Sequence, residues 1–130
     1  AGWFDSETMP KAEWDKIVSL NLTGVFMCAQ AEGRGMLEAG YGKIINTASM
    51  SGLIINRGIH GRTYETAKAA VIHFTRALAA DWAPYNINVN AIAPGYIATD
   101  NNAALRADPA QQQAQTKHDR CNREPVGHLR

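Results

Sequence analysis

The chain has 130 residues, of which 45% are hydrophobic and 19% are charged, and its formal net charge at neutral pH is +1. This composition is typical of a soluble α/β protein, and no apolar run reaches the roughly 20 residues that a membrane-spanning helix needs. The 13 basic and 12 acidic residues are interspersed, which argues against nucleic acid as a partner because a phosphate-binding surface is one-sided and basic.

The two cysteines give no sign of a disulfide or a metal site. Cys28 and Cys121 are far apart in the sequence and lack metal-ligand spacing, and the N-terminal residues show no signal-peptide pattern. We therefore expect both to be free thiols in a reducing cytoplasm, and we expect no bound metal.

The first predicted element is a helix from Glu13 to about Glu38. Apolar residues recur in it at the spacing of one buried helical stripe, at Trp14, Ile17, Val18, Leu22, Val25 and Ala29. Asn21 falls on the same stripe. From the residues alone, a single Asn on an apolar face is more often a satisfied core amide than a catalytic group.

A short buried strand of parallel type is predicted next, from Lys43 to Ala48, after glycines at 40 and 42 break the helix. Ser49 stands at the carboxyl end of this strand, where ligands gather in open doubly wound sheets. Ser51 is its rival for a catalytic role. For both serines the alternative is a turn residue whose hydroxyl satisfies the local backbone.

The second predicted helix runs from about Tyr64 to Trp82 and opens with Tyr64-Glu-Thr-Ala-Lys68. A Tyr and a Lys four residues apart share one helical face, so the ammonium can stabilise the phenolate. A phenol has an ordinary pKa of about 10, and a nearby cation lowers it toward the range of a useful base. The pair alone is weak support for catalysis, because the spacing arises often by chance.

Two apolar stripes follow along this second helix. One holds Tyr64, Lys68, Val71, Ile72, Thr75 and Ala79, and the other holds Ala67, Ala70, Phe74 and Leu78. Two stripes predict that the helix is covered on both sides, by the sheet on one and on the other by another helix, either of this chain or of a partner subunit. The preceding loop holds Arg57, His60 and Arg62, which we interpret as solvated residues, although the two arginines could bind a carboxylate.

The last predicted strand spans Asn86 to Ala93, after Pro84 ends the helix. The segment Pro94-Gly95-Tyr-Ile97-Ala-Thr99 follows it. Taken alone, this segment is an ordinary Pro-Gly turn leaving a buried strand.

In order, type and spacing, these segments resemble the classical short-chain dehydrogenase/reductase family from about residue 1 to about residue 110. The resemblance rests on Trp14 to Phe26, on Ser49 within a Ser-x-x-Gly pattern, on Tyr64-x-x-x-Lys68 and on Ile87 to Thr99. It implies an α/β fold with a partial doubly wound Rossmann-type parallel sheet. It also implies an oxidoreductase that uses NAD or NADP to transfer hydride to or from a secondary alcohol or ketone.

The resemblance implies a role for each matching residue. Tyr64 would be the acid/base, and Lys68 would assist it and hold the nicotinamide ribose. Ser49 would hydrogen-bond the substrate oxygen, and Asn21 would position a water in a proton relay. The nicotinamide loop would comprise Pro94, Gly95, Ile97 and Thr99. Family members also pair the two long helices between subunits, which implies a homo-oligomer.

The chain also departs from the family pattern. It has no Gly-x-x-x-Gly-x-Gly turn for the cofactor phosphates, and Ala1-Gly2 resembles the end of the family's Asn-Ala-Gly motif, so we expect a fragment that begins mid-fold. We expect residues 1–111 to form the partial domain and residues 112–130 to be a polar, disordered tail without the family's last strand. Such a chain should be only marginally stable by itself.

Two short segments point to the substrate. Asp100 to Pro109 resembles sugar-acid dehydrogenases, and Ser49 to Asn56 resembles polyol dehydrogenases. A small carbohydrate substrate is therefore expected, while the choice between NAD and NADP stays open. The competing hypothesis is a catalytically inactive chain that only associates with full-length relatives.

Overall fold

The structure, a computed structural model, describes residues 4–56, 62–97 and 107. The chain divides into two compact units, one formed by residues 1–55 and 60–95 and the other by residues 56–59 and 96–130. In the second unit the Tyr96 hydroxyl donates to Asn56 Oδ1 over 3.5 Å. All helices and strands below belong to the first unit. The predicted boundary at residue 111 lies outside the described residues and stays a prediction.

The first helical region is longer than predicted and contains an irregular turn. Helix α1 (Lys11–Val18) continues through a π-helical turn (Ser19–Thr23) into helix α2 (Gly24–Ala39). The region begins directly after Pro10, and it ends at Gly40, whose φ of 63° is the left-handed conformation that glycine tolerates best. The predicted helix over residues 13–38 is confirmed, but its apolar period gave no sign of the π-helical turn.

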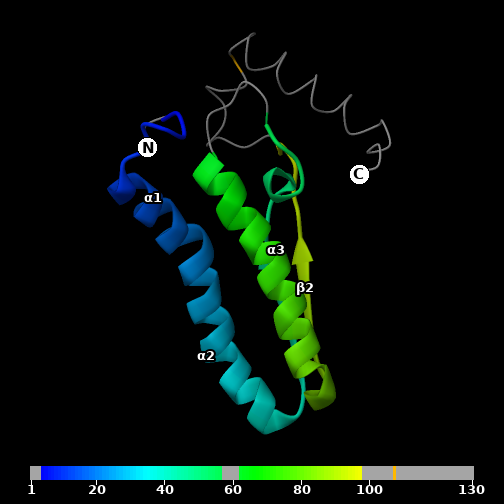
Figure 1. Cartoon of the computed structure of the whole chain (residues 1–130). Coiled ribbons are helices and arrows are strands. Elements are labelled where there is room, and N and C mark those ends of the chain that lie inside the picture. Colours follow the sequence, from blue (N-terminus) through cyan, green and yellow to red (C-terminus); the bar gives the residue numbers. More distant parts are fainter. Residues whose placement is uncertain (1–3, 57–61, 98–106, 108–130) are drawn as a thin grey trace, which may run out of the picture. The chain divides into compact units, whose positions relative to one another are not determined.

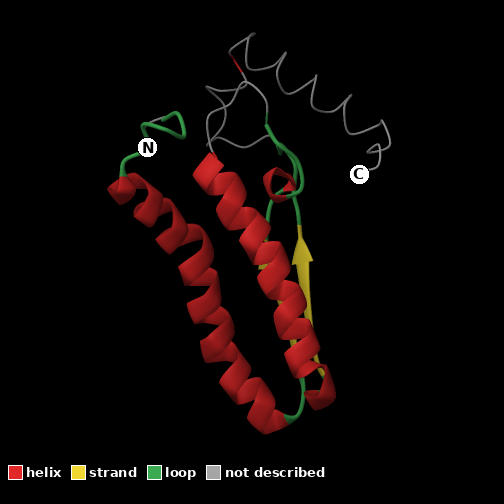
Figure 2. Cartoon of the chain, viewed as in Figure 1, coloured by secondary structure: helices red, strands yellow, loops and turns green. Residues whose placement is uncertain are grey.

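Strands β1 (Gly42–Thr47) and β2 (Ile87–Ile92) form a parallel two-stranded sheet in which Gly42 pairs with Ile87 and Thr47 with Ile92. Helix α3 (Arg62–Trp82) connects them, completing a β-α-β unit (Figure 2). Both strands were predicted to within one residue at each end, and the α/β fold class is confirmed.

Among residues 4–56 and 62–97, helices cover one face of the sheet and leave the other exposed. Burial alternates along β1, so that Ile44 is buried while Ile45 next to it is 66% exposed. The sequence predicts a strand buried on both faces, and within the described residues helices cover only one. The described part of the chain therefore leaves the other face of the sheet without a helical cover, although parallel sheets are usually covered on both faces.

The core lies where the covered face of the sheet meets α2 and α3 (Figure 1). Its centre consists of Ile44, Ile87 and Val89, and the residues packed around it are Met36, Leu37, Leu78, Ala79 and Trp82. Gly33 allows Trp82 to lie against α2, because a Cβ at position 33 would be only 2.3 Å from the indole ring.

The two faces of α3 differ in detail from the predicted stripes. Its buried residues are Thr63, Glu65, Ala67, Val71 and Thr75, so Ala67 and Val71 share a face although we assigned them to different stripes. Phe74 contacts Phe26 on the helical region before β1, with ring centroids 6.0 Å apart. A helix covered by the sheet on one side and by a second helix on the other is confirmed.

Candidate active site

Lys68 connects the start of α3 to the end of β1. Its Nζ lies 5.7 Å from the centroid of the Tyr64 ring and donates a hydrogen bond to the Thr47 carbonyl oxygen over 2.9 Å. Burial lowers the pKa of Lys68 below its ordinary value of 10.5, because a partly desolvated ammonium is less stable. The structure thus places the Tyr64 ring and a half-buried cation side by side.

Ser49 follows β1 and is buried. Its Oγ accepts a hydrogen bond from the Ser51 backbone N–H over 3.2 Å and caps a short 3-10 turn (Met50–Gly52). Ser49 therefore has the alternative role considered above, that of a turn residue whose hydroxyl bonds to the local backbone. It does not exclude the catalytic role, because the hydroxyl keeps its own O–H to donate.

Pro94 and Gly95 lie against the residue that follows Ser49. Parallel pairing continues past the strands, since Ala48 N–H donates to the Ile92 carbonyl over 2.8 Å and Met50 N–H to the Pro94 carbonyl over 3.0 Å. A Cβ at Gly95 would lie 3.3 Å from the Met50 sulfur. The ends of both strands thus meet at one edge of the sheet, as the doubly wound pattern predicts.

Two residues of the predicted nicotinamide loop are not tested by the structure. Ile97 belongs to the second compact unit, and Thr99 lies outside the described residues. Their predicted contacts with the cofactor stay predictions.

Asn21 lies in the π-helical turn, which packs against α3. Its side-chain Nδ2 donates to the Ile17 carbonyl oxygen over 3.0 Å. Among the described residues, no hydrogen bond joins Asn21 to Ser49, Tyr64 or Lys68. This local bond agrees with the alternative interpretation of Asn21 as a hydrogen-bonded amide without a catalytic role. The π-helical turn, however, is a feature that often occurs at functional sites.

A buried polar pair that the sequence did not reveal ties the strand to the helix. Asn46 Nδ2 donates to Thr75 Oγ1 over 2.9 Å, and that hydroxyl donates to the Val71 carbonyl over 2.8 Å. Asn46 is three residues before Ser49. Its polarity inside an apolar strand was the only available signal, because a buried amide needs a partner.

The structure describes one of the three loop residues that we discounted, Arg62. Arg57 and His60 lie outside the described residues. Arg62 pairs with Glu65 at 2.8 Å, and the Glu65 side chain is buried. The Arg62 side chain is still 42% exposed, as expected of a surface charge, and the carboxylate that it binds is Glu65 of the same helix.

Over residues 4–56, 62–97 and 107, no group of three or more His, Cys, Asp or Glu side chains could hold a metal ion. In the same ranges, none of the helices combines the length and apolarity required to cross a membrane. Cys28 is a free, exposed thiol. Cys121 lies outside the described residues, so two free thiols in a cytoplasmic protein stay a prediction.

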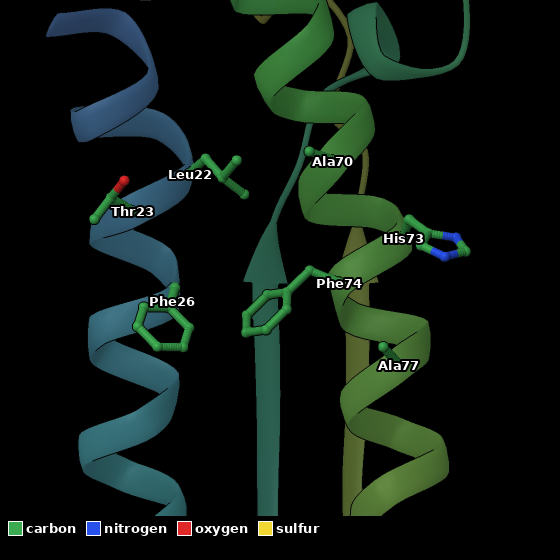
Figure 3. A pocket seen from close by; sticks show the side chains of 7 residues that line it. All are labelled: Leu22, Thr23, Phe26, Ala70, His73, Phe74 and Ala77. Carbon is green, nitrogen blue, oxygen red and sulfur yellow. The ribbon is translucent and has the colours of Figure 1, made fainter. Parts of the chain in front are cut away.

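An open apolar groove of about 520 Å³ runs between the first helical region and α3. It is lined by Leu22, Thr23, Phe26, Ala70, His73, Phe74 and Ala77. Figure 3 shows Leu22 and Phe74 both pointing into the gap between the two helical segments, whereas His73 points away from it. None of the four predicted catalytic residues lines this groove, so it is a separate surface.

The chain matches known proteins over most of its length. The model of a family described as short chain dehydrogenase matches residues 1–110. Galactitol 2-dehydrogenase from Rhizobium johnstonii is 45% identical over 103 residues, which are 79% of this chain and 40% of that protein. The 2-dehydro-3-deoxy-D-gluconate 5-dehydrogenase of Dickeya dadantii is 47% identical over 105 residues, 80% of this chain and 41% of that protein.

A solved structure shows the same fold. The crystal structure of a gluconate 5-dehydrogenase from Burkholderia cenocepacia, in complex with NADP and tartrate, superposes with a TM-score of 0.77 at 36% identity. The superposition covers 85% of this chain and 42% of that one. The chain thus spans about 40% of the length of the curated relatives it matches.

Proposed function

Because this chain belongs to the short chain dehydrogenase family, we propose that it carries the acid/base half of an NAD- or NADP-dependent oxidoreductase site. The reaction is hydride transfer between the nicotinamide ring and the carbon of a secondary alcohol or ketone. The observation that carries the proposal is the position of Lys68, whose ammonium lies beside the Tyr64 ring and is anchored to the end of β1.

Tyr64 is the proton acceptor in the direction of alcohol oxidation. Its phenolate oxygen takes the proton of the substrate hydroxyl, and the Lys68 ammonium stabilises that anion by its charge. The Ser49 hydroxyl donates to the substrate oxygen and holds it in place. Asn21 positions a water of the proton relay, supported by its place in a π-helical turn packed on α3.

The residues at the strand ends suit a nicotinamide nucleotide. Lys68 offers a cationic donor to the ribose hydroxyls, and Pro94 and Gly95 bring exposed or half-buried backbone next to Met50. Ile97 and Thr99 complete the nicotinamide loop. When bound, the nicotinamide supplies the hydride chemistry, and the side chains of this chain supply the proton and hold the reacting oxygen. The distinction between NAD and NADP stays open.

The substrate is a sugar acid or a polyol. This assignment draws on relatives named for galactitol and for 2-dehydro-3-deoxy-D-gluconate, and on a neighbour that carries NADP and tartrate. All three names belong to polyhydroxylated compounds or their acids.

The groove between the first helical region and α3 is the surface for a second copy of the chain. Phe26 and Phe74 meet there as a tilted aromatic pair, and Phe26 is still 43% exposed. A symmetric partner with the same apolar residues covers such a surface in most homo-oligomers.

The second candidate function is a catalytically inactive chain that only associates with full-length relatives. The uncovered sheet face favours it, because Ile45 and Ile92 are 66% and 52% exposed and no helix among the described residues covers them. It differs from the first candidate in cofactor binding.

The test is a fluorescence titration with NADH and NADPH, on the chain alone and on the chain joined to the part of a relative that it does not match. Tyr64→Phe with Lys68→Ala is the inactive control, and Tyr85→Phe is a matched control at an exposed tyrosine. Binding and turnover that the inactive control abolishes support the oxidoreductase. If neither form binds NADH or NADPH but the chain still associates with a full-length relative, the result supports the inactive chain.

A further inference from the structure

The 3-10 turn that follows Ser49 packs against α3 at unusually short range. A Cβ at Gly52 would lie 2.7 Å from Ala69 N, 2.7 Å from the Lys68 carbonyl carbon and 2.8 Å from the Lys68 carbonyl oxygen. All three atoms belong to the helix backbone. Unlike the end of a side chain, they cannot rotate away, so only glycine fits at this position without movement of the turn or the helix.

Space alone requires this glycine. Among the glycines that the structure describes, only Gly40 has a positive φ, so the backbone conformation of Gly52 is open to any residue. An alanine at position 52 therefore tests the close contact with α3 and nothing else.

The close approach of Gly52 to α3 is one of two contacts that join Lys68 to the segment after β1. The Gly52 N–H donates to the Ser49 carbonyl over 3.0 Å, while the Lys68 Nζ donates to the Thr47 carbonyl over 2.9 Å. Lys68 is thus held at its backbone by Gly52 and at its ammonium by Thr47. Both contacts come from one short segment, and Ser49 lies inside that segment.

The same turn is fixed from the side of β2. The N–H of Met50 donates to the Pro94 carbonyl over 3.0 Å, and the carbonyl of Met50 accepts from the Leu53 N–H over 2.8 Å. Movement of the turn would therefore be transmitted to Ser49, to Lys68 and to the Pro94–Gly95 segment together.

We propose that Gly52 is a positioning residue, whose close approach to the α3 backbone sets the distance between Ser49 and Lys68. The proposal rests on the proposed function of these two side chains. An alanine would force the turn back by roughly 0.7 Å to reach ordinary contact at 3.4 Å. Because a misplacement of about 1 Å at a reacting centre costs about 100-fold, we expect kcat to fall about 10- to 100-fold.

The kinetic test compares Gly52→Ala with Gly35→Ala in the active, joined form of the chain. Gly35 is a matched control because it has open space around its Cβ position. We expect Gly52→Ala to lower kcat with little change in KM for the alcohol, and Gly35→Ala to change neither. A Gly52→Ala variant that folds and retains full kcat would overturn the proposal.

A double variant separates positioning from a general loss of stability. If Gly52 acts through Ser49, then Gly52→Ala costs less in a Ser49→Ala background than in the wild type. Losses that simply multiply would contradict the proposal, because they would show that Gly52 acts independently of Ser49.

A third measurement needs neither a variant nor activity. In the 130-residue chain, the Gly52 and Leu53 amides should exchange with deuterium about as slowly as the Ala69 amide, since an isolated turn of three residues would not protect them. Exchange at the rate of an unstructured peptide would overturn the proposal. Absence of dehydrogenase activity with protected amides would instead refute the proposed function and leave the packing claim intact.

Discussion

Two regions beside α3 are built differently. One is the corner formed by Ser49, Gly52 and Lys68, and the other is the groove between the first helical region and α3. The corner is held by backbone hydrogen bonds and by contact between backbone atoms. The groove is lined almost entirely by apolar side chains and is open to solvent. Backbone contacts fix atoms to within fractions of an ångström, and a catalytic reaction requires that precision. Burial of an apolar surface, in contrast, contributes free energy of association with any partner whose shape fits it.

This difference predicts what substitutions will do. Changes in the corner should alter rates with little effect on assembly, and changes in the groove should alter assembly first. The predictions below are ordered from the largest expected effect to the smallest.

Tyr64→Phe removes the proposed proton acceptor and should lower kcat by about 100- to 10,000-fold in the joined, active form, because general acid–base catalysis contributes about that factor. Steady-state kinetics measure the loss, and circular dichroism checks that the fold is unchanged. Tyr85→Phe removes an equivalent hydroxyl from another exposed tyrosine and should have no effect. Equal kcat for Tyr64→Phe and wild type would remove Tyr64 from the mechanism.

Phe74→Asp places a charge beside Phe26 in the groove. It should weaken self-association by at least about 30-fold, the effect of losing a hot-spot contact worth about 2 kcal/mol. Light scattering over a range of concentrations measures the change. Tyr85→Asp is the control, because Tyr85 is exposed and lies outside the groove. If Phe74→Asp and wild type associate equally, the second copy does not bind in this groove.

Gly33→Ala and Gly35→Ala sharpen the comparison within a single helix. A Cβ at Gly33 would be 2.3 Å from the Trp82 ring, whereas one at Gly35 would meet nothing within 4 Å. We expect Gly33→Ala to lower the free energy of unfolding by about 1–3 kcal/mol through overpacking. Gly35→Ala should raise it by up to about 1 kcal/mol through helix propensity. Urea unfolding measures both, and shifts of the same sign would contradict the packing of Trp82 on α2.

The smallest effect concerns the burial of Lys68. Because burial lowers its pKa in the folded state, the unfolded chain holds this proton more readily between the lowered value and 10.5. The free energy of unfolding should therefore rise with pH across that window, relative to a Lys68→Met variant. Urea unfolding of both proteins between about pH 8 and 11 measures the difference. A difference that falls with rising pH would contradict the burial of the ammonium.

The local features of this fold could be predicted from the sequence. Helix and strand boundaries follow from apolar periodicity and from breakers such as Gly40 and Pro84, which act within a few residues. The proximity of Tyr64 and Lys68 is also local, because residues four apart share a helical face. These predictions needed no knowledge of how the elements pack.

The missed features depend on packing. The Lys68–Thr47 bond joins residues 21 apart and the Asn46–Thr75 bond residues 29 apart. The close fit of Gly52 against the backbone of α3 likewise depends on the three-dimensional arrangement. The Ser-x-x-Gly pattern therefore identified Gly52 but did not explain why a glycine is needed there. The π-helical turn at Asn21 was also missed, because the search for a regular apolar period of 3.6 residues treats residues 13–38 as one uninterrupted α-helix.

The most direct test of the account is the environment of Lys68 in a crystal structure of the joined form with bound NADP. The account predicts that Lys68 Nζ lies within hydrogen-bond distance, about 3 Å, of the nicotinamide ribose hydroxyls, with Tyr64 and Ser49 facing the same nicotinamide ring. A cofactor bound away from Lys68, with the ammonium still bonded to Thr47 alone, would contradict it.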